Sequence, residues 1–398
     1  MRLGRLAILS LVHLVVDGYG TFIPALWVVI QDVFELSGLQ VGLFLGLGML
    51  PANVLQPFYG MVDQRFARWF VVLGPLLAVV CLSMVGLASS LTVLIMLVLL
   101  GMAGVGLFHP EGAVLAGRFG AAGSPRAMAM FIGSGFLGQA LGPVFISTIV
   151  ATESDFGASW KAVFPGLAVL AVLAVATVMG SRLGRIPDPP LPESRSSILL
   201  ALAGRWRAVV CLISLNTVRF IGLMMIYLTI PLFAKFSGFS QVRIGQLMMV
   251  FNGAQGAGML IGGLVAPVHR ERAMLITSLA MVLLPASLLP VVEPSAVIWC
   301  LAVVGFCLGS TIPVAVQLGQ EITPGGKRWI SGMLMGFSWG VGALLAPPLA
   351  GYISEAYSPN HSFTIAVMIL AGALLLAFVL PNQAHLNCLK DSQPDQTR

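Results

Sequence analysis

The sequence predicts an all-α membrane protein with twelve transmembrane helices, arranged as two pseudo-symmetric six-helix bundles. Three observations support this class. Apolar residues make up 58% of the 398 and charged residues only 9%, the mean hydropathy is +0.97, and long apolar runs recur along the whole chain. Soluble domains carry roughly 25% charged residues. Each membrane crossing needs about 20 apolar residues, so twelve spans with short connections account for the chain.

Composition excludes several other classes of protein. A transmembrane β-barrel is excluded because the apolar runs are continuous rather than alternating. Glycine (45) and proline (24) are abundant, which suits membrane bundles, where small residues permit close helix contact. The net charge of +6 comes from basic residues scattered singly over short connections, so it indicates topology rather than nucleic-acid binding. No metal-ligand or disulfide spacing is present, and we expect reduced thiols at Cys81, Cys211, Cys300, Cys307 and Cys388.

Apolar runs bounded by charge, Gly or Pro place the individual spans. The first six are predicted at residues 6–27, 39–62, 69–88, 93–116, 127–150 and 162–181. The second six are predicted at residues 208–233, 244–266, 273–292, 296–318, 330–353 and 363–380. The first run is not expected to be a signal peptide, because Asp17 interrupts it and no small-residue cleavage site follows.

The distribution of Lys and Arg predicts the orientation of the spans. Most of these residues fall in alternate connections, which the positive-inside rule assigns to the cytoplasm. The members on that side are Arg65, Arg68, Arg118, Arg126, Arg182, Arg185, Arg195, Arg205, Arg207, Arg270, Arg272, Lys327 and Arg328. The opposite connections carry Lys161, Lys235 and Arg243. We therefore expect both termini in the cytoplasm and a multi-pass protein of the bacterial inner (plasma) membrane.

Polar segments and an internal repeat predict the domain organisation. Residues 182–207 hold four prolines and mixed charges and are interpreted as a cytoplasmic linker. Residues 1–181 and 208–380 then form the two bundles. Residues 381–398 are polar, and we expect a disordered cytoplasmic tail. Landmarks recur about 203 residues apart. The matched sets are Gly60 with Gly263, Gly106 and Pro110 with Gly309 and Pro313, and Gly138, Gly142 and Pro143 with Gly342, Ala346 and Pro347.

Two ionisable residues of the first span are candidate functional groups, because a charge near the bilayer centre costs roughly 2.5–3.5 kcal/mol on insertion scales. His13 and Asp17 are spaced i, i+4 and so share one helical face. That face should turn inward, since lipid offers neither group a partner. We interpret the pair as a proton-accepting site, because imidazole titrates near neutral pH. The alternative is a hydrogen-bonded pair that only holds the first span to a neighbour.

The fourth span carries a second candidate group, His109-Pro110-Glu111. Proline removes a helical hydrogen bond and bends the helix, so His109 and Glu111 are expected near a flexible point and are assigned to proton coupling. The alternative for Glu111 is a pairing with Arg118 or Arg126 at the end of the helix.

Arg219 is the one basic residue that we place inside a span, close to the repeat counterpart of Asp17. We interpret it as a group that binds an anionic substrate or pairs with Asp17 when the site is empty. The alternative is an arginine that extends toward the cytoplasmic surface. Neutral polar residues in the spans could add hydrogen bonds to substrate or could hold helices together. They are Asn216, Tyr227, Asn252 and Gln255 in the second half and Asn53, Gln56 and Gln139 in the first.

Other functional classes find less support in the sequence. A membrane-embedded enzyme would need a nucleophile or a set of metal ligands, and two histidines and two carboxylates on the first and fourth spans could in principle coordinate zinc. Their spacing resembles no dedicated metal motif, however, and they are split between distant spans, so we expect no metal site and no cofactor. A phosphate-binding glycine loop with lysine is absent, which argues against ATP-driven pumping. The retained intramembrane charges argue against a scaffold without transport.

Several motifs resemble those of the major facilitator transporters, and within them the fosmidomycin-resistance family of bacterial drug exporters. They are His13 and Asp17 followed by Pro24-Ala25-Leu26, Gln56-Pro57 with Gly60, Phe108-His109-Pro110-Glu111, and Arg219 followed by Ile230-Pro231-Leu232. The resemblance covers essentially the full membrane region and implies the major facilitator fold. In addition, Gly138 with Gly142 and Pro143 resembles the helix-five signature of exchangers that export substrate against protons, which implies a gating role for the three residues.

The connection after the second span departs from the superfamily pattern, which places an acid four residues beyond the glycine and then a basic residue. Here Gln64 holds that place and Asp63 lies one earlier, while Arg65 and Arg68 fit. The resemblance implies that this loop latches one conformation. We therefore assign conformational gating to Gly60, Asp63, Arg65 and Arg68.

Together these features lead us to expect proton-driven antiport of a small organic compound or drug. Protons are expected to bind Asp17, Glu111 or a histidine and thereby to weaken substrate binding. Arg219 favours an anionic substrate. Uptake of such a solute by proton symport is the alternative. The expected partners are a small molecule, protons and the lipid bilayer, with no nucleic acid, and the protein is expected to act as a monomer.

Overall fold

The computed structural model of the 398-residue chain describes residues 3–59, 62, 66, 68–119, 125–151, 156–181, 202–265, 270–323 and 326–391. The regular structure within these ranges is helical, without a strand. Eleven of the described helical segments are long and apolar enough to cross a membrane, and the shorter apolar helix α4 (Gly38–Asn53) supplies a twelfth. The predicted all-α membrane fold is confirmed.

The helices follow the predicted spans in order, with most ends within a few residues of those predicted. The first half contains α1 (Leu3–Gly20), α2 (Phe22–Ala25), α3 (Trp27–Val33), α4, α5 (Gln56–Tyr59), α7 (Phe70–Ser83), η1 (Met84–Leu87), α8 (Leu91–Phe119), α9 (Pro125–Ala151) and α10 (Phe156–Ser181). The second half contains α12 (Trp206–Phe236), α13 (Gln241–Val265), α14 (Glu271–Leu288), α15 (Val297–Ile322), α16 (Lys327–Ser331), the π-helical segment η3 (Gly332–Phe337), α17 (Ser338–Ala356), α18 (Pro359–Val379) and α19 (Gln383–Asp391).

The first span is interrupted twice and continues to Val33 rather than ending near Trp27. At the first interruption, the Gly18 carbonyl accepts hydrogen bonds from both the backbone N–H and the Oγ1 hydroxyl of Thr21, at 3.2 and 2.8 Å. Pro24 then lacks the N–H that a regular helix would need. Thr21 and Pro24, at this interruption, line the cavity described below.

The second span is also broken, between Asn53 and Gln56. Pro51 lies inside α4, and the Leu50 carbonyl accepts from both Val54 and Leu55, at 2.9 and 3.2 Å, where the helix ends. The Asn53 side chain donates to the Met49 carbonyl at 3.0 Å. Proline inside a membrane helix is tolerated where other groups satisfy the freed carbonyls. The break places Asn53 and Gln56 beside the cavity described below.

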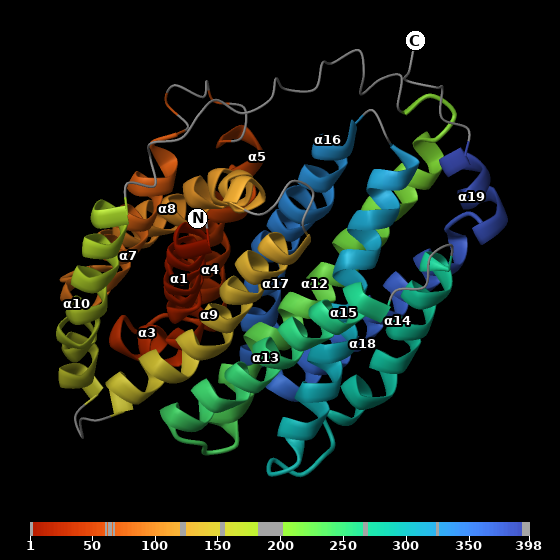
Figure 1. The fold of residues 1–398 in the computed structure, drawn as a ribbon. Coiled ribbons are helices and arrows are strands. Elements are labelled where there is room, and N and C mark those ends of the chain that lie inside the picture. Colours follow the sequence, from red (N-terminus) through yellow and green to blue (C-terminus); the bar gives the residue numbers. More distant parts are fainter. Residues whose placement is uncertain are drawn as a thin grey trace.

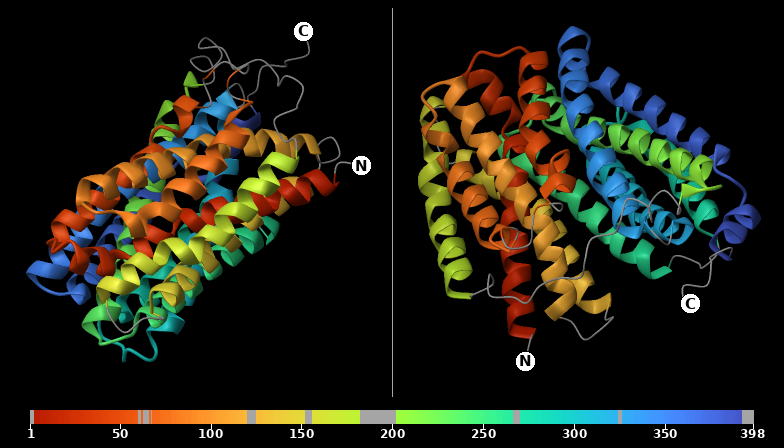
Figure 2. Two further views of the ribbon diagram at one scale, coloured as in Figure 1. Left: turned by 90° about the vertical axis from the view of Figure 1, so that its left-hand side faces the viewer. Right: turned by 90° about the horizontal axis from the view of Figure 1, so that it is seen from above.

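The helices of the two halves lie on opposite sides of the molecule, with α1 to α10 on one side and α12 to α19 on the other (Figures 1 and 2). Two helix pairs form most of the contact between the halves, α4 with α17 and α9 with α13. Glycines allow this close approach. A Cβ atom on Gly42 would lie 2.4 Å from the Pro347 carbonyl oxygen, and one on Gly245 would lie 2.7 Å from the Pro143 carbonyl oxygen. The linker boundaries stay a prediction, because residues 182–201 lie outside the described ranges.

Polar contacts tie the halves together at the end of the bundle where α3 ends and α4 begins. Lys235 Nζ lies 2.6 and 2.8 Å from the two carboxylate oxygens of Asp32. The Gly38 N–H donates to Glu355 Oε2 at 2.7 Å. Gln241 Nε2 donates to the Ala25 carbonyl at 2.8 Å. An exposed ion pair contributes at most about 1 kcal/mol, so the glycine-based helix packing carries most of this contact.

The C-terminal segment differs from the predicted disordered tail. Gln383–Asp391 form helix α19, and Leu386 is fully buried in an apolar cluster with Leu212, Leu318 and others. Arg272 fixes the preceding chain by donating to the Leu380 carbonyl at 3.0 Å. Among the residues of α19 whose burial is described, Leu386 is the one that is buried. A single apolar residue does not form a periodic pattern from which a packed helix could be predicted. Residues 392–398 lie outside the described ranges.

Candidate functional site

A cavity of about 200 Å³ lies between the two halves. Its lining comes from the broken parts of the first and second spans and from α8, α9, α12, α13 and the η3–α17 region. Eight of the residues predicted to bind protons or substrate line it. They are Asp17, Asn53, Gln56, His109, Gln139, Tyr227, Asn252 and Gln255. Apolar and aromatic residues of α12 and α17, among them Phe220 and Trp339, complete the wall.

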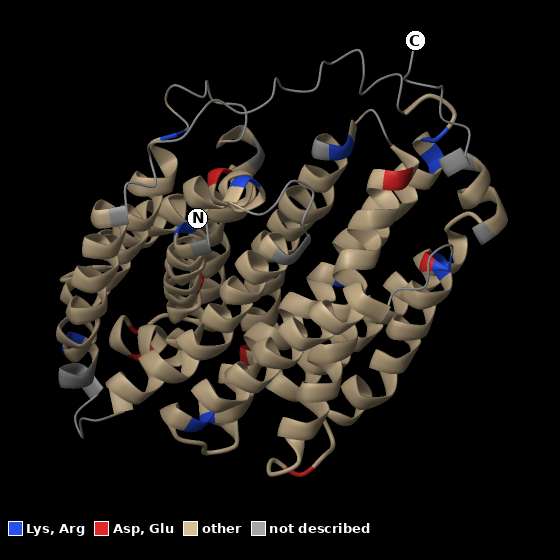
Figure 3. Cartoon of the chain, viewed as in Figure 1, with Lys and Arg blue, Asp and Glu red and all other residues tan. Residues whose placement is uncertain are grey.

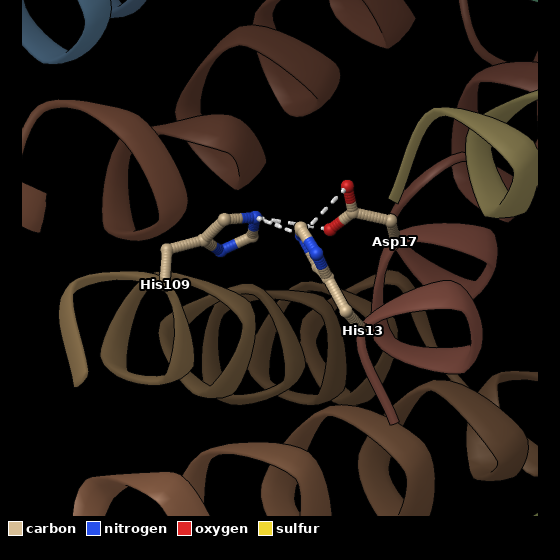
Figure 4. Close-up of side chains that lie close together, drawn as sticks. All are labelled: His13, Asp17 and His109. Carbon is tan, nitrogen blue, oxygen red and sulfur yellow. Dashed lines mark hydrogen bonds and ion pairs between the residues drawn. The ribbon is translucent and has the colours of Figure 1, made fainter. Parts of the chain in front are cut away.

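Three ionisable side chains, His13, Asp17 and His109, lie close together in Figure 4, and Asp17 and His109 line the cavity. His109 Nε2 lies 3.0 Å from Asp17 Oδ1. His13 Nε2 lies 3.4 Å from Asp17 Oδ2 and also 3.4 Å from His109 Nε2. His13 and Asp17 are each only 5% exposed. The structure therefore brings together three of the four predicted proton-coupling residues, which come from α1 and α8.

Backbone carbonyls orient both imidazole rings. His13 Nδ1 lies 2.7 Å from the Phe131 carbonyl oxygen, and His109 Nδ1 lies 2.7 Å from the Val105 carbonyl oxygen. A carbonyl can only accept a hydrogen bond, so each Nδ1 carries a hydrogen. The Phe131 ring also stacks on His13 at a centroid distance of 4.0 Å. Both Nε2 atoms therefore face Asp17.

Asp17 is linked to the second half of the chain through α9. Gln139 Nε2 donates to Asp17 Oδ2 at 2.9 Å. Asn252 of α13 donates to the Gln139 backbone carbonyl at 2.8 Å, and its amide nitrogen lies 3.4 Å from the Tyr227 hydroxyl. Polar residues that sequence analysis could only group by type thus form one chain of contacts across the cavity.

Arg219 does not form the predicted pair with Asp17. Its side chain is fully buried. Its Nη2 donates to Asn216 Oδ1 at 2.7 Å and its Nη1 to the Leu308 carbonyl at 3.3 Å. Neither Arg219 nor Asn216 lines the cavity. The reason is helical geometry, because Phe220 and Leu223 occupy the face of α12 that borders the cavity, and Arg219 points toward α15 instead.

Other predicted residues lie away from the cluster. Glu111 is partly buried on α8 and does not line the cavity. Arg68 is exposed, with its guanidinium over the Trp69 ring at 5.8 Å. Gly60, Asp63 and Arg65 lie outside the described residues, and their gating role stays a prediction.

The helix-five glycines pack within the first half. A Cβ atom on Gly138 would lie 2.0 Å from the Leu14 carbonyl oxygen, and one on Gly142 would lie 2.3 Å from the Gly18 carbonyl oxygen. They let α9 approach α1 at the level of Asp17. Pro143 is different, because its carbonyl lies beside Gly245 of α13 in the other half.

Sequence analysis missed Gly135, which makes room for the cluster. A Cβ atom there would lie 2.6 Å from His13 Nε2 and 2.7 Å from Asp17 Oδ2. The signal was present as a third glycine, one turn before Gly138 on α9, but nothing in the sequence shows which glycine faces the cluster.

Replacing Gly135 by Ala is expected to reduce transport strongly without comparable loss of stability. The added methyl group meets side-chain atoms of His13 and Asp17, which can shift, so the cluster is distorted while α1 and α9 remain packed. Gly133→Ala is the matched control, because no heavy atom lies within 4 Å of a Cβ there. Transport in proteoliposomes and thermal unfolding measure the two effects. Equal transport by both variants would contradict this role of Gly135.

A cavity between the two halves of a multi-pass helical bundle is the arrangement found in transporters built from two repeats. The sequence matches the family model of the Major Facilitator Superfamily over residues 8–333. The chain therefore belongs to the major facilitator superfamily, and it is a transporter rather than an enzyme.

Particular relatives agree with this assignment. The chain is 26% identical over 389 residues to the fosmidomycin resistance protein of Escherichia coli (strain K12), covering 96% of this chain and 94% of the relative. It is 27% identical over 392 residues to the uncharacterized MFS-type transporter YfnC of Bacillus subtilis (strain 168), covering 96% and 93%. The predicted resemblance is confirmed.

Solved structures show the same fold at low identity. A bacterial homologue of the human lysosomal transporter Spinster, in an inward-facing and occupied conformation, has a TM-score of 0.77 at 14% identity, with 95% of this chain and 96% of that chain covered. The nucleoside transporter NupG, in a mutant form, has a TM-score of 0.74 at 14% identity, with 96% and 100% covered.

Proposed function

We propose that this transporter exports a small organic compound in exchange for protons. The observation that carries the proposal is the Asp17 carboxylate, which lies between two imidazole Nε2 atoms at the wall of the cavity shared by both halves. Imidazole and carboxylate groups can exchange protons near neutral pH when they are buried together. Relatedness to a fosmidomycin resistance protein favours export and a drug-like substrate.

Coupling follows if proton and substrate compete for the same polar contacts. With the cluster deprotonated, Gln139 donates to the Asp17 carboxylate, and the other neutral polar residues around the cavity are available to a substrate. A proton bound at the cluster strengthens the contact between α1 and α8 and changes the charge that Gln139 meets. Because Gln139 also touches Asn252 of the other half, this change reaches the helix pair that joins the halves.

We propose that the end of the bundle with Lys235 and Asp32 faces away from the cytoplasm and that both termini are cytoplasmic. Most Lys and Arg residues described lie toward the opposite end (Figure 3), as the positive-inside rule requires. The protein then acts as a monomer in a bacterial inner membrane, since each chain holds a whole cavity between its own halves.

The test uses inverted membrane vesicles loaded with a pH indicator. A proton gradient directed out of the acidified lumen is expected to drive substrate accumulation in the lumen, and substrate addition is expected to release protons from it, with fosmidomycin as the first probe. A drug-susceptibility panel on cells with and without the gene, with and without an uncoupler, broadens the search. Substrate leaving the vesicle lumen together with protons would instead support the alternative, proton-coupled uptake.

Arg219 extends the proposal to an anionic substrate, if the helices around it rearrange during transport. The Phe220 and Trp339 rings stack at 4.5 Å and both line the cavity, and Arg219 Nε has no hydrogen-bond partner. Arg219→Lys is expected to weaken binding of an anionic substrate by roughly tenfold or more, because the two-pronged contact is lost. Arg243→Gln, at the end of α13, is the control. Unchanged affinity in Arg219→Lys would remove Arg219 from the substrate site.

A further inference from the structure

The cluster of His13, Asp17 and His109 has the composition of a metal site. Its three candidate ligand atoms lie within 4.8 Å of one another, and no other such group occurs among the described residues. Two imidazoles and one carboxylate are ligands that suit zinc and similar divalent transition metals. The objection raised by the sequence was that these residues belong to distant spans, and the packing of α1 against α8 removes it.

The distances are close to those around a tetrahedral ion. A zinc ion with bonds of about 2.0–2.2 Å holds neighbouring ligand atoms roughly 3.3–3.5 Å apart. Here the two Nε2 atoms are 3.4 Å apart, and they lie 3.4 and 3.0 Å from two different oxygens of the Asp17 carboxylate. With one ligand atom from each residue, the three atoms lie within 4.8 Å of one another, so the side chains must move closer together before one ion can bond to all three.

The surroundings of the cluster also resemble those of a metal site. Histidines that bind a metal usually donate their other ring N–H to a backbone carbonyl or carboxylate. Both rings do so here, to the Phe131 and Val105 carbonyls at 2.7 Å. The Gln139 amide holds the carboxylate at 2.9 Å. Asp17 and His109 also border the cavity, which leaves an open side for water or for a ligand atom of a substrate.

We propose that His13, Asp17 and His109 bind a divalent transition metal ion of the zinc type, with the fourth position open to the cavity. The proposal deepens the proposed function and rests on it, because both assign a role to the same three residues. A bound ion occupies the place of the coupling proton and joins α1 to α8. The metal therefore inhibits proton-coupled transport.

The test is binding of Co²⁺ and Zn²⁺ to the tag-free, metal-stripped protein in detergent. Co²⁺ reports its coordination through visible absorption. We expect one ion per chain with a low-coordinate spectrum and displacement by Zn²⁺ but not by Mg²⁺. His109→Gln, His13→Gln and Asp17→Asn are each expected to weaken Co²⁺ binding by roughly 100-fold or more. This loss exceeds the roughly 10- to 100-fold loss of metal affinity that follows when a residue that only hydrogen-bonds to a metal ligand is changed. His361→Gln and His385→Gln, which change exposed histidines, are expected to bind as the unchanged protein does.

X-ray absorption of the zinc-loaded unchanged protein keeps the test independent of how the variants fold. Two imidazole ligands and one further oxygen ligand from the protein, without sulfur, are expected. Absence of binding, binding that persists in His109→Gln, or a sulfur ligand would overturn the proposal.

Proton flux measured in the presence of a chelator separates the two ideas. If flux depends on Asp17 under chelation while no Co²⁺ binds, the metal site is wrong and the proposed function stands. If Co²⁺ binds as expected while flux does not depend on Asp17, the metal site stands and the proton-coupling role fails.

Discussion

Replacing Asp17 by Asn is expected to abolish most of the substrate-dependent proton movement, because an amide cannot take up and release a proton as a carboxylate does. The side chain keeps its shape but no longer carries the charge between His13 Nε2 and His109 Nε2. Binding of substrate without a gradient is expected to persist, since the other polar residues of the cavity are unchanged. Proton flux and equilibrium binding in proteoliposomes measure the two quantities separately.

Glu293→Gln is the matched control for this variant, because Glu293 is exposed between α14 and α15 and does not line the cavity. It is expected to transport as the unchanged protein does. Thermal unfolding shows whether Asp17→Asn is folded. If folded Asp17→Asn moved protons with substrate at the normal rate, the cluster would be a structural link between α1 and α8, and coupling would have to be sought elsewhere.

Replacing Gly42 by Leu is expected to shift the transporter toward the state in which the end near Asp32 and Lys235 is open. A Cβ atom at residue 42 would lie 2.4 Å from the Pro347 carbonyl oxygen and 2.5 Å from the Pro348 Cα. These are backbone atoms, so α4 and α17 must separate to accept any side chain. Transporters built from two repeats rock about a central site, and this contact must open in one of the two states.

Thiol labelling measures this shift. With the five native cysteines replaced by serine, a cysteine at the cavity residue Met224 is labelled with an impermeant maleimide from the side that carries Asp32. The rate is expected to rise by roughly tenfold or more, since a minor state is often populated at only about 0.1–10%. Gly180→Leu is the control, because residue 180 has open space around it. An unchanged rate in a folded Gly42→Leu protein would show that this contact does not gate access.

Much of the candidate site could be predicted from the residue types alone. Buried ionisable groups are costly in a membrane, so the sequence singles out His13, Asp17 and His109, although it does not show that the three side chains meet. Arg219 shows the limit of this argument. The repeat offset placed it near Asp17, but a rotation of about one residue along a helix turns a side chain by roughly 100 degrees. Arg219 therefore points toward α15, and Phe220 takes the cavity face.

The sequence by itself determined the class of fold, the order of the spans and the chemistry available inside them, because the bilayer requires long apolar helices and makes each polar residue an exception. Only the tertiary structure decided which of these polar residues meet. The breaks beside Thr21 and Asn53, the room left by Gly135 and the contact from Gln139 to Asn252 depend on how helices from distant parts of the chain pack. Such packing is set by side-chain shape across helices, which no pattern along one helix records.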